Sequence, residues 1–211
     1  MNQTKALQWA VWGVLVLVIA GICVAFFLES TQSKSGRAGA ASELPVIKAI
    51  DSFTLTNQFG AEVTPASLRG TPWIANIFFT RCPSICLQMT QRMKEIQDAS
   101  AAGKDLNLVS ITTDPDFDQP EILARYGKRF GSDTNRWSFL TGEKSEIGRA
   151  IQKELLLAVQ ENPEDSRQSE LDLYTHSSLI VLVDGESRIR STYESLGTNT
   201  VQEIIADLDR L

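Results

Sequence analysis

The sequence predicts an α/β domain in which parallel strands joined by helices are followed by an antiparallel hairpin. Residues 73–79 are almost continuously apolar, which favours a central strand buried on both faces. Residues 178–183 and 188–193 favour two further strands, because they flank Asp184-Gly185-Glu186-Ser187, a sequence typical of hairpin turns. Between these strands, apolar residues recur at helical spacing. Together the three observations indicate a mixed sheet that is covered by helices.

The N-terminal 43 residues differ in composition from the rest of the chain. After a short tail of residues 1–5, residues 6–28 contain no charge over 23 positions. A helix of this length covers roughly 34 Å at about 1.5 Å per residue, against about 30 Å for a hydrocarbon core. The alternative is a cleavable signal peptide, whose apolar part is usually only about 7–15 residues long. We therefore expect a transmembrane anchor, followed over 29–43 by a small, polar and flexible tether.

The domain behind this anchor is expected outside the cytoplasm. Lys5 precedes the apolar span and Lys34 and Arg37 follow it, so the positive charges do not decide the orientation. A short tail with most of the protein behind it is most simply a signal anchor with a translocated domain. We expect a single-pass protein of a bacterial inner (cytoplasmic) membrane, with its domain on the periplasmic or other extracytoplasmic side.

Residues 44–211 account for one domain, whose remaining elements follow from periodicity and turn signals. An N-terminal β-hairpin is expected over 53–56 and 61–64, which flank a turn that contains Gly60. The other elements expected are a helix over 83–101, a strand over 106–112, a helix over 118–130, a short extended segment over 137–140, a helix over 143–159, an acidic surface loop over 160–172 and a closing helix over 200–211. This order is the thioredoxin-like arrangement.

Charge and cysteine usage narrow the class of function. The formal net charge is −6 and no Lys/Arg run appears, which disfavours nucleic-acid binding. Of the three cysteines, Cys23 lies within the predicted anchor, so a disulfide framework is excluded. The pair Cys82 and Cys86 therefore needs an explanation of its own.

Cys82 and Cys86 lie where the strand over 73–79 leads into the next helix. The unpaired amides and the dipole of a helix N-terminus favour thiolate over thiol. A spacing of four residues allows both sulfurs to face the same side of the first turn. Such a pair suits a metal clip or a dithiol redox couple.

His176, the only histidine of the chain, directly precedes the strand over 178–183. In a thioredoxin-like core this position lies beside the start of the first helix, so one imidazole and two thiolates are expected to converge. Thiolates suit Cu(I) and imidazole lets the same site hold Cu(II), whereas zinc would need a fourth ligand. The nearest candidate for a fourth ligand is Asp114, at the end of the second strand.

Other interpretations of the cysteine pair stay open from the residues alone. A thiol–disulfide oxidoreductase is one, although its usual motif is C-x-x-C. A structural disulfide is another, but it would close so small a loop that it restrains little of the unfolded chain. Among the neighbours, Asp118 is expected to cap a helix, Asp114 fits ordinary turn chemistry before Pro115, and Arg81 either favours the Cys82 thiolate or is solvated.

Four segments resemble the Sco/SenC family of thioredoxin-like copper chaperones, which are tethered to the membrane and take part in assembling the CuA centre of cytochrome c oxidase. FFTRCPSIC is similar to the family's strand-to-CPxxC segment, and ITTDPDFDQPEILARYGKRFG to its DPxxDxP segment. WSFLTG is similar to its W-x-F-L-T-G segment, and THSSLIVLVDGESRIRSTY to its HS…VD..G segment. The sequence departs from the family pattern at Leu87, where Pro commonly follows the second cysteine.

The resemblance implies a ligand set, a cargo and partners. It implies that Cys82, Cys86 and His176 bind copper, as Cu(I) and Cu(II), with Asp114 as a possible accessory acid. The implied partner is cytochrome c oxidase subunit II, with other copper chaperones or thiol–disulfide reductants beside it. The implied role is a metallochaperone that delivers copper or reduces target cysteines, rather than a conventional enzyme. The alternative is a thiol–disulfide oxidoreductase or redox sensor that uses the same two cysteines.

Overall fold

The computed structural model of the chain describes residues 9, 12–13, 19–22, 43–82, 85–167 and 172–211. The chain divides into two units, Met1–Ser42 and Glu43–Leu211. The described residues of the first unit are helical. Among the described residues, no helix combines the length and the apolarity needed to cross a membrane. Most of the anchor predicted over 6–28 and nearly all of the tether predicted over 29–43 lie outside the described residues, so both stay predictions.

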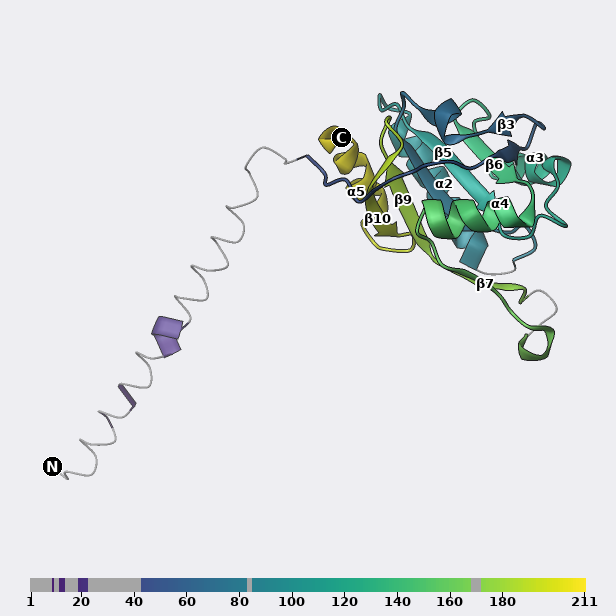
Figure 1. Cartoon of the computed structure of the whole chain (residues 1–211). Coiled ribbons are helices and arrows are strands. Elements are labelled where there is room, and N and C mark those ends of the chain that lie inside the picture. Colours follow the sequence, from purple (N-terminus) through teal and green to yellow (C-terminus); the bar gives the residue numbers. More distant parts are fainter. Residues whose placement is uncertain (1–8, 10–11, 14–18, 23–42, 83–84, 168–171) are drawn as a thin grey trace. The chain divides into compact units, whose positions relative to one another are not determined.

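The second unit contains, in its described part, a mixed sheet of eight strands in the order β1-β10-β9-β4-β5-β6-β2-β3 (Figure 1). Its three central strands run parallel: β4 (Trp73–Phe78), β5 (Asn107–Thr112) and β6 (Trp137–Thr141). The strands outside them pair antiparallel: β1 (Lys48–Ala49), β2 (Leu55–Asn57), β3 (Glu62–Val63), β9 (Leu179–Val183) and β10 (Arg188–Glu194). The predicted hairpins at both ends of the domain are confirmed as β2–β3 and β9–β10.

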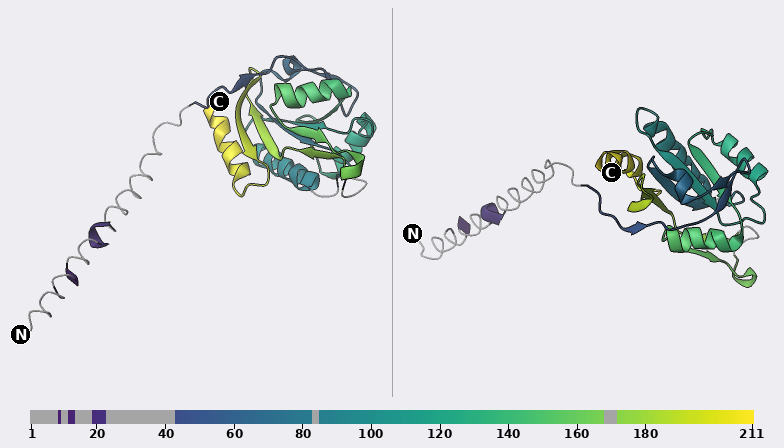
Figure 2. Two further views of the ribbon diagram at one scale, coloured as in Figure 1. Left: turned by 60° about the horizontal axis from the view of Figure 1, so that its bottom comes forward. Right: turned by 45° about the horizontal axis from the view of Figure 1, so that its top comes forward.

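Helices cover both faces of this sheet (Figure 2). One face carries α2 (Ile85–Ser100), α3 (Pro120–Arg129) and α5 (Thr200–Asp207). The other carries α4 (Lys144–Gly148) and its π-helical continuation η2 (Arg149–Glu154). Side chains of β4 alternate between the two cores, with Trp73 and Ile77 on the α4 side and Ile74 and Phe78 on the α2 side. Burial on both faces explains the continuous apolarity of this strand.

The helix predicted over 143–159 is confirmed as far as Glu154 and is wrong beyond it. The helical run ends at Glu154, and Leu156 has a φ of 57°, so the chain turns there. β7 (Val159–Glu161) follows and pairs with β8 (Tyr174–His176) in a separate two-stranded sheet, which extends away from the main sheet in Figure 1. Part of the loop predicted over 160–172 is therefore strand, with a short 3-10 turn η3 (Glu164–Ser166) between.

Other boundaries also differ from the prediction. The extended segment over 137–140 is β6, a full member of the parallel sheet. The helix predicted from 118 begins at Pro120, and the edge strand β1 was not predicted. Two further 3-10 turns are η1 (Pro65–Leu68) and η4 (Leu208–Arg210), the latter ending the helix that was predicted to run to 211. Residues 83–84, the predicted start of the helix that is α2, lie outside the described residues.

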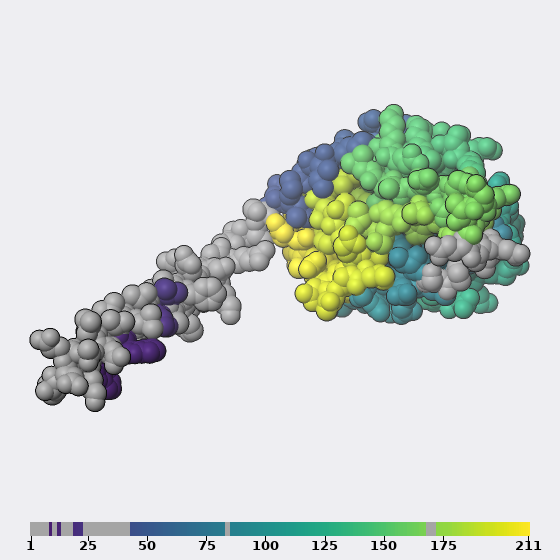
Figure 3. All heavy atoms as spheres, turned by 90° about the horizontal axis from the view of Figure 1, so that it is seen from below, coloured from purple at the N-terminus to yellow at the C-terminus, as the bar shows by residue number. Residues whose placement is uncertain are grey.

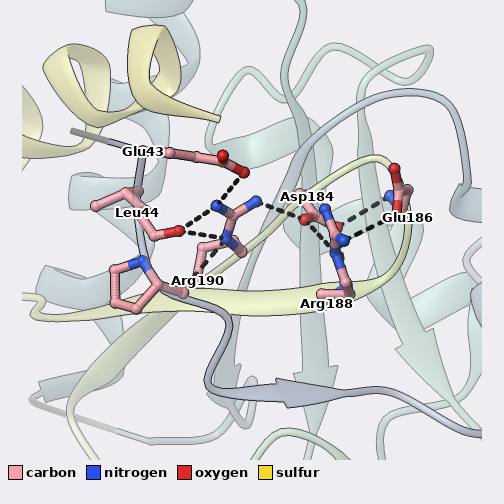
Figure 4. Close-up of polar contacts among 7 residues, drawn as sticks. Glu43, Leu44, Asp184, Glu186, Arg188 and Arg190 are labelled. Atoms are coloured by element: carbon pink, nitrogen blue, oxygen red, sulfur yellow. Dashed lines mark hydrogen bonds and ion pairs between the residues drawn. The ribbon is translucent and has the colours of Figure 1, made fainter. Parts of the chain in front are cut away.

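A buried arginine fixes the start of the second unit to the β9–β10 hairpin (Figure 4). Arg190 is only 1% exposed, and its Nη1 lies 2.8 Å from Oδ2 of Asp184. The same guanidinium donates to the carbonyl oxygens of Leu44 and Pro45 and to the carboxylate of Glu43. We call this group the Arg190 clamp. It lies at the end of the sheet where β4 begins, because Val183 of β9 pairs with Trp73.

Candidate metal centre

Cys82 and Cys86 lie at the opposite end of β4, where the chain leads into α2. Cys82 is 8% exposed and Cys86 is fully buried, and no disulfide joins them. The amide of Cys82 donates to the carbonyl of Phe79 at 3.2 Å, which closes a turn directly after the strand. Cys86 lies in the first turn of α2 and is hydrogen-bonded to Cys82. The two sulfur groups therefore share one side of the turn.

His176 reaches this pair from the end of β8. Its Nε2 lies 3.2 Å from Sγ of Cys86, and its Nδ1 lies 3.0 Å from the carbonyl oxygen of Ser177. Because a carbonyl only accepts hydrogen bonds, Nδ1 must carry the hydrogen, and neutral His176 then presents the lone pair of Nε2 to Cys86. This arrangement of a histidine, with one nitrogen held by a carbonyl and the other available, is typical of metal ligands.

The β7–β8 sheet, rather than a loop before β9, brings His176 into place. Its register pairs Val159 with His176, while Tyr174 packs edge-on against Phe79 at a centroid distance of 5.6 Å. His176 itself is edge-on to Phe79 at 6.2 Å. Figure 3 shows green surface, the colour of this part of the chain, near blue-teal surface, the colour of α2. The sequence placed His176 correctly at the site but missed the strand that carries it.

The protonation of Cys86 differs from the prediction made for a helix N-terminus. A hydrogen bond with Cys82, together with burial, raises the pKa of the Cys86 thiol well above its ordinary value. These effects outweigh the helix dipole, which alone would favour the thiolate. Cys86 therefore carries a proton in the metal-free protein, and a bound metal ion must displace it.

Asp114 is paired with a neighbour of the cysteines. Its Oδ2 accepts from both Nε and Nη2 of Arg81, at 2.9 and 2.7 Å, and the carboxylate is almost fully buried. The guanidinium of Arg81 also lies over the ring of Phe117, 4.4 Å from its centroid. Arg81 thus binds an acid and an aromatic ring, and its side chain stays partly exposed. Asp114 lies beside the turn that leads to Cys82, with its charge already compensated.

Asp118 does not cap a helix, so that prediction is wrong. The N-cap of α3 is Gln119, and it makes no side-chain capping bond. Asp118 is instead fully buried, and it accepts from the backbone amide and hydroxyl of Thr80 and from the hydroxyl of Thr112. The sequence analysis missed both threonines. Their positions could have indicated this role: Thr80 follows the apolar strand β4 and Thr112 ends the apolar strand β5. The two strands are parallel neighbours, which brings both threonines to the same edge of the sheet.

The donor set at the site suits a soft metal ion. Within the residues that the structure describes, no group of three or more His, Cys, Asp and Glu side chains is already arranged to hold a metal ion. Cys86 is nevertheless in contact with both other candidates, Cys82 and His176. Two adjacent sulfurs and a nitrogen with an available lone pair are ligands that Cu(I) prefers.

Comparison with known proteins identifies the family of the chain. The SCO1/SenC family model matches residues 43–211. The SCO1 protein homolog of Bacillus subtilis is 30% identical over 166 residues, which are 78% of this chain and 83% of that protein.

Solved structures of relatives share the fold. One is BsSco, described as a member of the Sco family of cytochrome c oxidase assembly proteins with a disulfide switch; it has a TM-score of 0.69 at 28% identity and covers 80% of this chain and 96% of that one. Another is ScoI of Bradyrhizobium japonicum with copper bound, with a TM-score of 0.63 at 26% identity over 77% of this chain and 99% of that one. The predicted thioredoxin-like fold is confirmed, and the chain belongs to the SCO1/SenC family.

Proposed function

We propose that this protein is a membrane-anchored metallochaperone that carries copper on Cys82, Cys86 and His176 and helps to assemble the CuA site of cytochrome c oxidase. The observation that carries the proposal is the 3.2 Å contact between Nε2 of His176 and Sγ of Cys86, with Cys82 hydrogen-bonded to the same thiol. The copper in the structure of the related ScoI of Bradyrhizobium japonicum supports the choice of metal.

The chemistry of the site suits transfer of the ion. Two thiolates and one imidazole satisfy Cu(I) at a low coordination number, and the same nitrogen helps to hold Cu(II). Because few ligands are used, thiolates and imidazoles of a recipient protein can add to the ion before the carrier's ligands leave. Binding displaces the proton of Cys86, so copper affinity rises with pH.

The proposed location and partner follow from the rest of the sequence. The 23 uncharged residues over 6–28 support a single-pass anchor in a bacterial inner membrane, with the domain on the periplasmic side. The recipient that we propose is cytochrome c oxidase subunit II, since relatives in the family are described as cytochrome c oxidase assembly proteins.

A second candidate function is reduction of the recipient's cysteines. It is favoured by the hydrogen bond between Cys82 and Cys86 and by the disulfide switch described for BsSco. In this reaction the two thiols would become a disulfide while a disulfide of the recipient is reduced to two thiols, so electrons and protons balance.

The test measures Cu(I) affinity of the full chain in detergent by competition with a soft chelator. His176→Ala is expected to weaken binding by at least about tenfold, because one of three ligands is lost. Thr175→Ala, on the same strand and exposed, is the matched control and should leave the affinity unchanged. Equal affinity of His176→Ala and the unaltered protein would refute the copper proposal, and the reductase activity is then tested with a disulfide-containing peptide.

A further inference from the structure

Asp118 is a fully buried acid that lies between the carboxyl ends of β4 and β5. Its Oδ2 accepts from the amide of Thr80 at 3.0 Å and from the hydroxyl of Thr112 at 2.5 Å. Its Oδ1 accepts from the hydroxyl of Thr80. Burial of a carboxylate is strongly unfavourable unless it is hydrogen-bonded, and donors from the turn after β4 and from the end of β5 supply this compensation.

The directions of these hydrogen bonds are fixed by their neighbours. The amide of Asp114 donates to Oγ1 of Thr112 at 3.0 Å, so the hydroxyl hydrogen of Thr112 points to Asp118. The amide of Thr80 can only donate. Burial raises the pKa of Asp118, while the hydrogen bonds from both threonines act in the opposite direction. The surroundings are therefore built for a carboxylate that accepts from several donors at once.

These contacts reach the cysteines through one short turn. Thr80 lies two residues before Cys82, and Arg81 between them is bound to Asp114. Both residues that precede Cys82 are thus tied to acids of the segment that follows β5. Loss of the Asp118 carboxylate would release Thr80 while leaving the contact of Arg81 in place.

Asp118 also places a charge close to the sulfurs. Its carboxylate accepts from the amide of Thr80, two residues before Cys82, so it lies beside the turn that carries the first sulfur. A carboxylate at this place opposes any additional negative charge on the site. A complex of two thiolates and an imidazole carries one more negative charge with Cu(I) than with Cu(II), so the carboxylate disfavours the reduced complex.

We propose that Asp118 is a positioning residue of the copper site, which fixes the turn from Thr80 to Cys82 and places a negative charge beside this turn that lowers the reduction potential of bound copper. The proposal rests on the proposed function, because copper is the cargo of that function. It adds a residue that is not a metal ligand.

The test compares Asp118→Asn with Asp116→Asn in the full chain. Asn has the shape of Asp and keeps one acceptor, while its amide group can donate to the hydroxyl of Thr80, so the variant chiefly removes the charge. Asp116 is exposed and lies in the same segment, which makes it the matched control. Affinities for Cu(I) and for Cu(II) are each measured by competition with a chelator, and their ratio gives the potential.

Asp118→Asn is expected to raise the ratio of Cu(I) to Cu(II) affinity about tenfold, the order expected for one buried charge that is separated from the ion by a short turn, at an effective dielectric constant of about 20. In a one-electron couple this is an increase of about 59 mV. Asp116→Asn should change the ratio by less than about twofold, because solvent and salt screen an exposed charge.

A second pair of variants tests the positioning itself. Thr80→Val removes the hydroxyl that donates to Asp118, whereas Thr80→Ser keeps it. Thr80→Val is expected to shift the Cu(II)–thiolate absorption bands, and Thr80→Ser should keep the spectrum of the unaltered protein. If circular dichroism shows that Asp118→Asn does not fold, the two threonine variants test the proposal on their own. Identical absorption spectra for Thr80→Val and Thr80→Ser would overturn the proposal.

The metal-free protein gives a readout that does not depend on copper. In glutathione buffers, Cys82 and Cys86 lose two protons and two electrons to form a disulfide, while glutathione disulfide is reduced to two glutathione molecules. Asp118→Asn is expected to shift this equilibrium, because the turn that sets the approach of the two sulfurs loses part of its support, and Asp116→Asn is not. Equal shifts in both variants, for glutathione and for copper, would overturn the role of Asp118 even if the unaltered protein binds copper. Failure of the unaltered protein to bind copper would refute the proposed function instead.

Discussion

Replacement of Arg190 by Met should destabilise the domain far more than an arginine replacement usually does. Arg190 is 1% exposed and donates to Asp184 and to the carbonyl oxygens of Leu44 and Pro45. Met is similarly long and fills much of the same volume, so the variant removes the donors without opening a large cavity. The change therefore isolates the polar contribution of the Arg190 clamp.

The expected loss of stability depends on which hydrogen-bond donors each acceptor keeps in the Arg190→Met variant. The carbonyl of Leu44 loses its donor, which costs about 1–3 kcal/mol for a buried acceptor. Breaking a buried ion pair costs about 3–5 kcal/mol when the remaining charge has no other partner. Asp184 keeps Arg188 at 2.8 Å and the amides of Glu186 and Arg188, so its share is smaller. We expect a loss of about 3 kcal/mol in the free energy of unfolding, which lowers Tm by roughly 6–12 °C for a domain of this size.

The assay is urea unfolding of the full chain, followed by tryptophan fluorescence, with Arg188→Met as the control. Arg188 contacts the same oxygen of Asp184, but its side chain is 32% exposed, so its loss should shift the midpoint much less. Copper affinity should change in neither variant, because the clamp and the cysteines lie at opposite ends of β4. Equal midpoints for Arg190→Met and Arg188→Met would refute the reasoning that burial sets the strength of the clamp.

Two further predictions concern pH and packing. Burial alone would raise the pKa of Asp184, but its hydrogen bonds, of which the one from Arg190 has the largest effect, lower the pKa in the folded protein. The stabilising contribution of the Asp184 carboxylate is therefore present above the unfolded pKa of about 3.9. It is lost as the pH falls through the lower pKa of the folded state. Between pH 6 and pH 3 the urea midpoint of Asp184→Asn should fall less than that of the unaltered protein, and parallel curves would contradict this. Gly127→Ala should cost about 1–3 kcal/mol in unfolding free energy, because its Cβ would lie 2.8 Å from the ring of Phe139. Gly148→Ala, also helical but with space around it, should be neutral or stabilising by up to about 1 kcal/mol in the same urea unfolding assay.

The parts of the fold that could be predicted are those with a local physical signal. The apolarity of β4 and the turn between β9 and β10 both report burial or backbone geometry directly. The end of the helix at Glu154 gives no such signal, because Ile151, Leu155 and Val159 keep helical spacing across it. Leucine is also an unexpected residue for the left-handed conformation found at position 156.

The site shows the same division. Cys82, Cys86 and His176 could be proposed from residue type and position, since few residues can bind a soft metal ion. The role of Asp118 could not, because an acid before Gln119-Pro120 has the sequence signature of a helix cap. Its true partners are contributed by β4 and β5, and only the register that pairs Phe78 with Thr112 brings them together.

The two sides of the proposed copper site are held with different strength, and this difference bears on how copper would leave the site. The turn before Cys82 is fixed by Asp114 and Asp118, which are both buried. His176 lies on the β7–β8 sheet, whose contacts with the rest of the domain include the edge-on packing of Tyr174 and His176 on Phe79 and an exposed ion pair at 2.7 Å between Lys144 and Glu161. An aromatic contact contributes about 0.5–1.5 kcal/mol and an exposed ion pair about 0–1 kcal/mol. In the proposed ligand exchange with subunit II, the imidazole would therefore be the ligand that withdraws at the least energetic cost, while both sulfurs would keep the ion until incoming thiolates replace them.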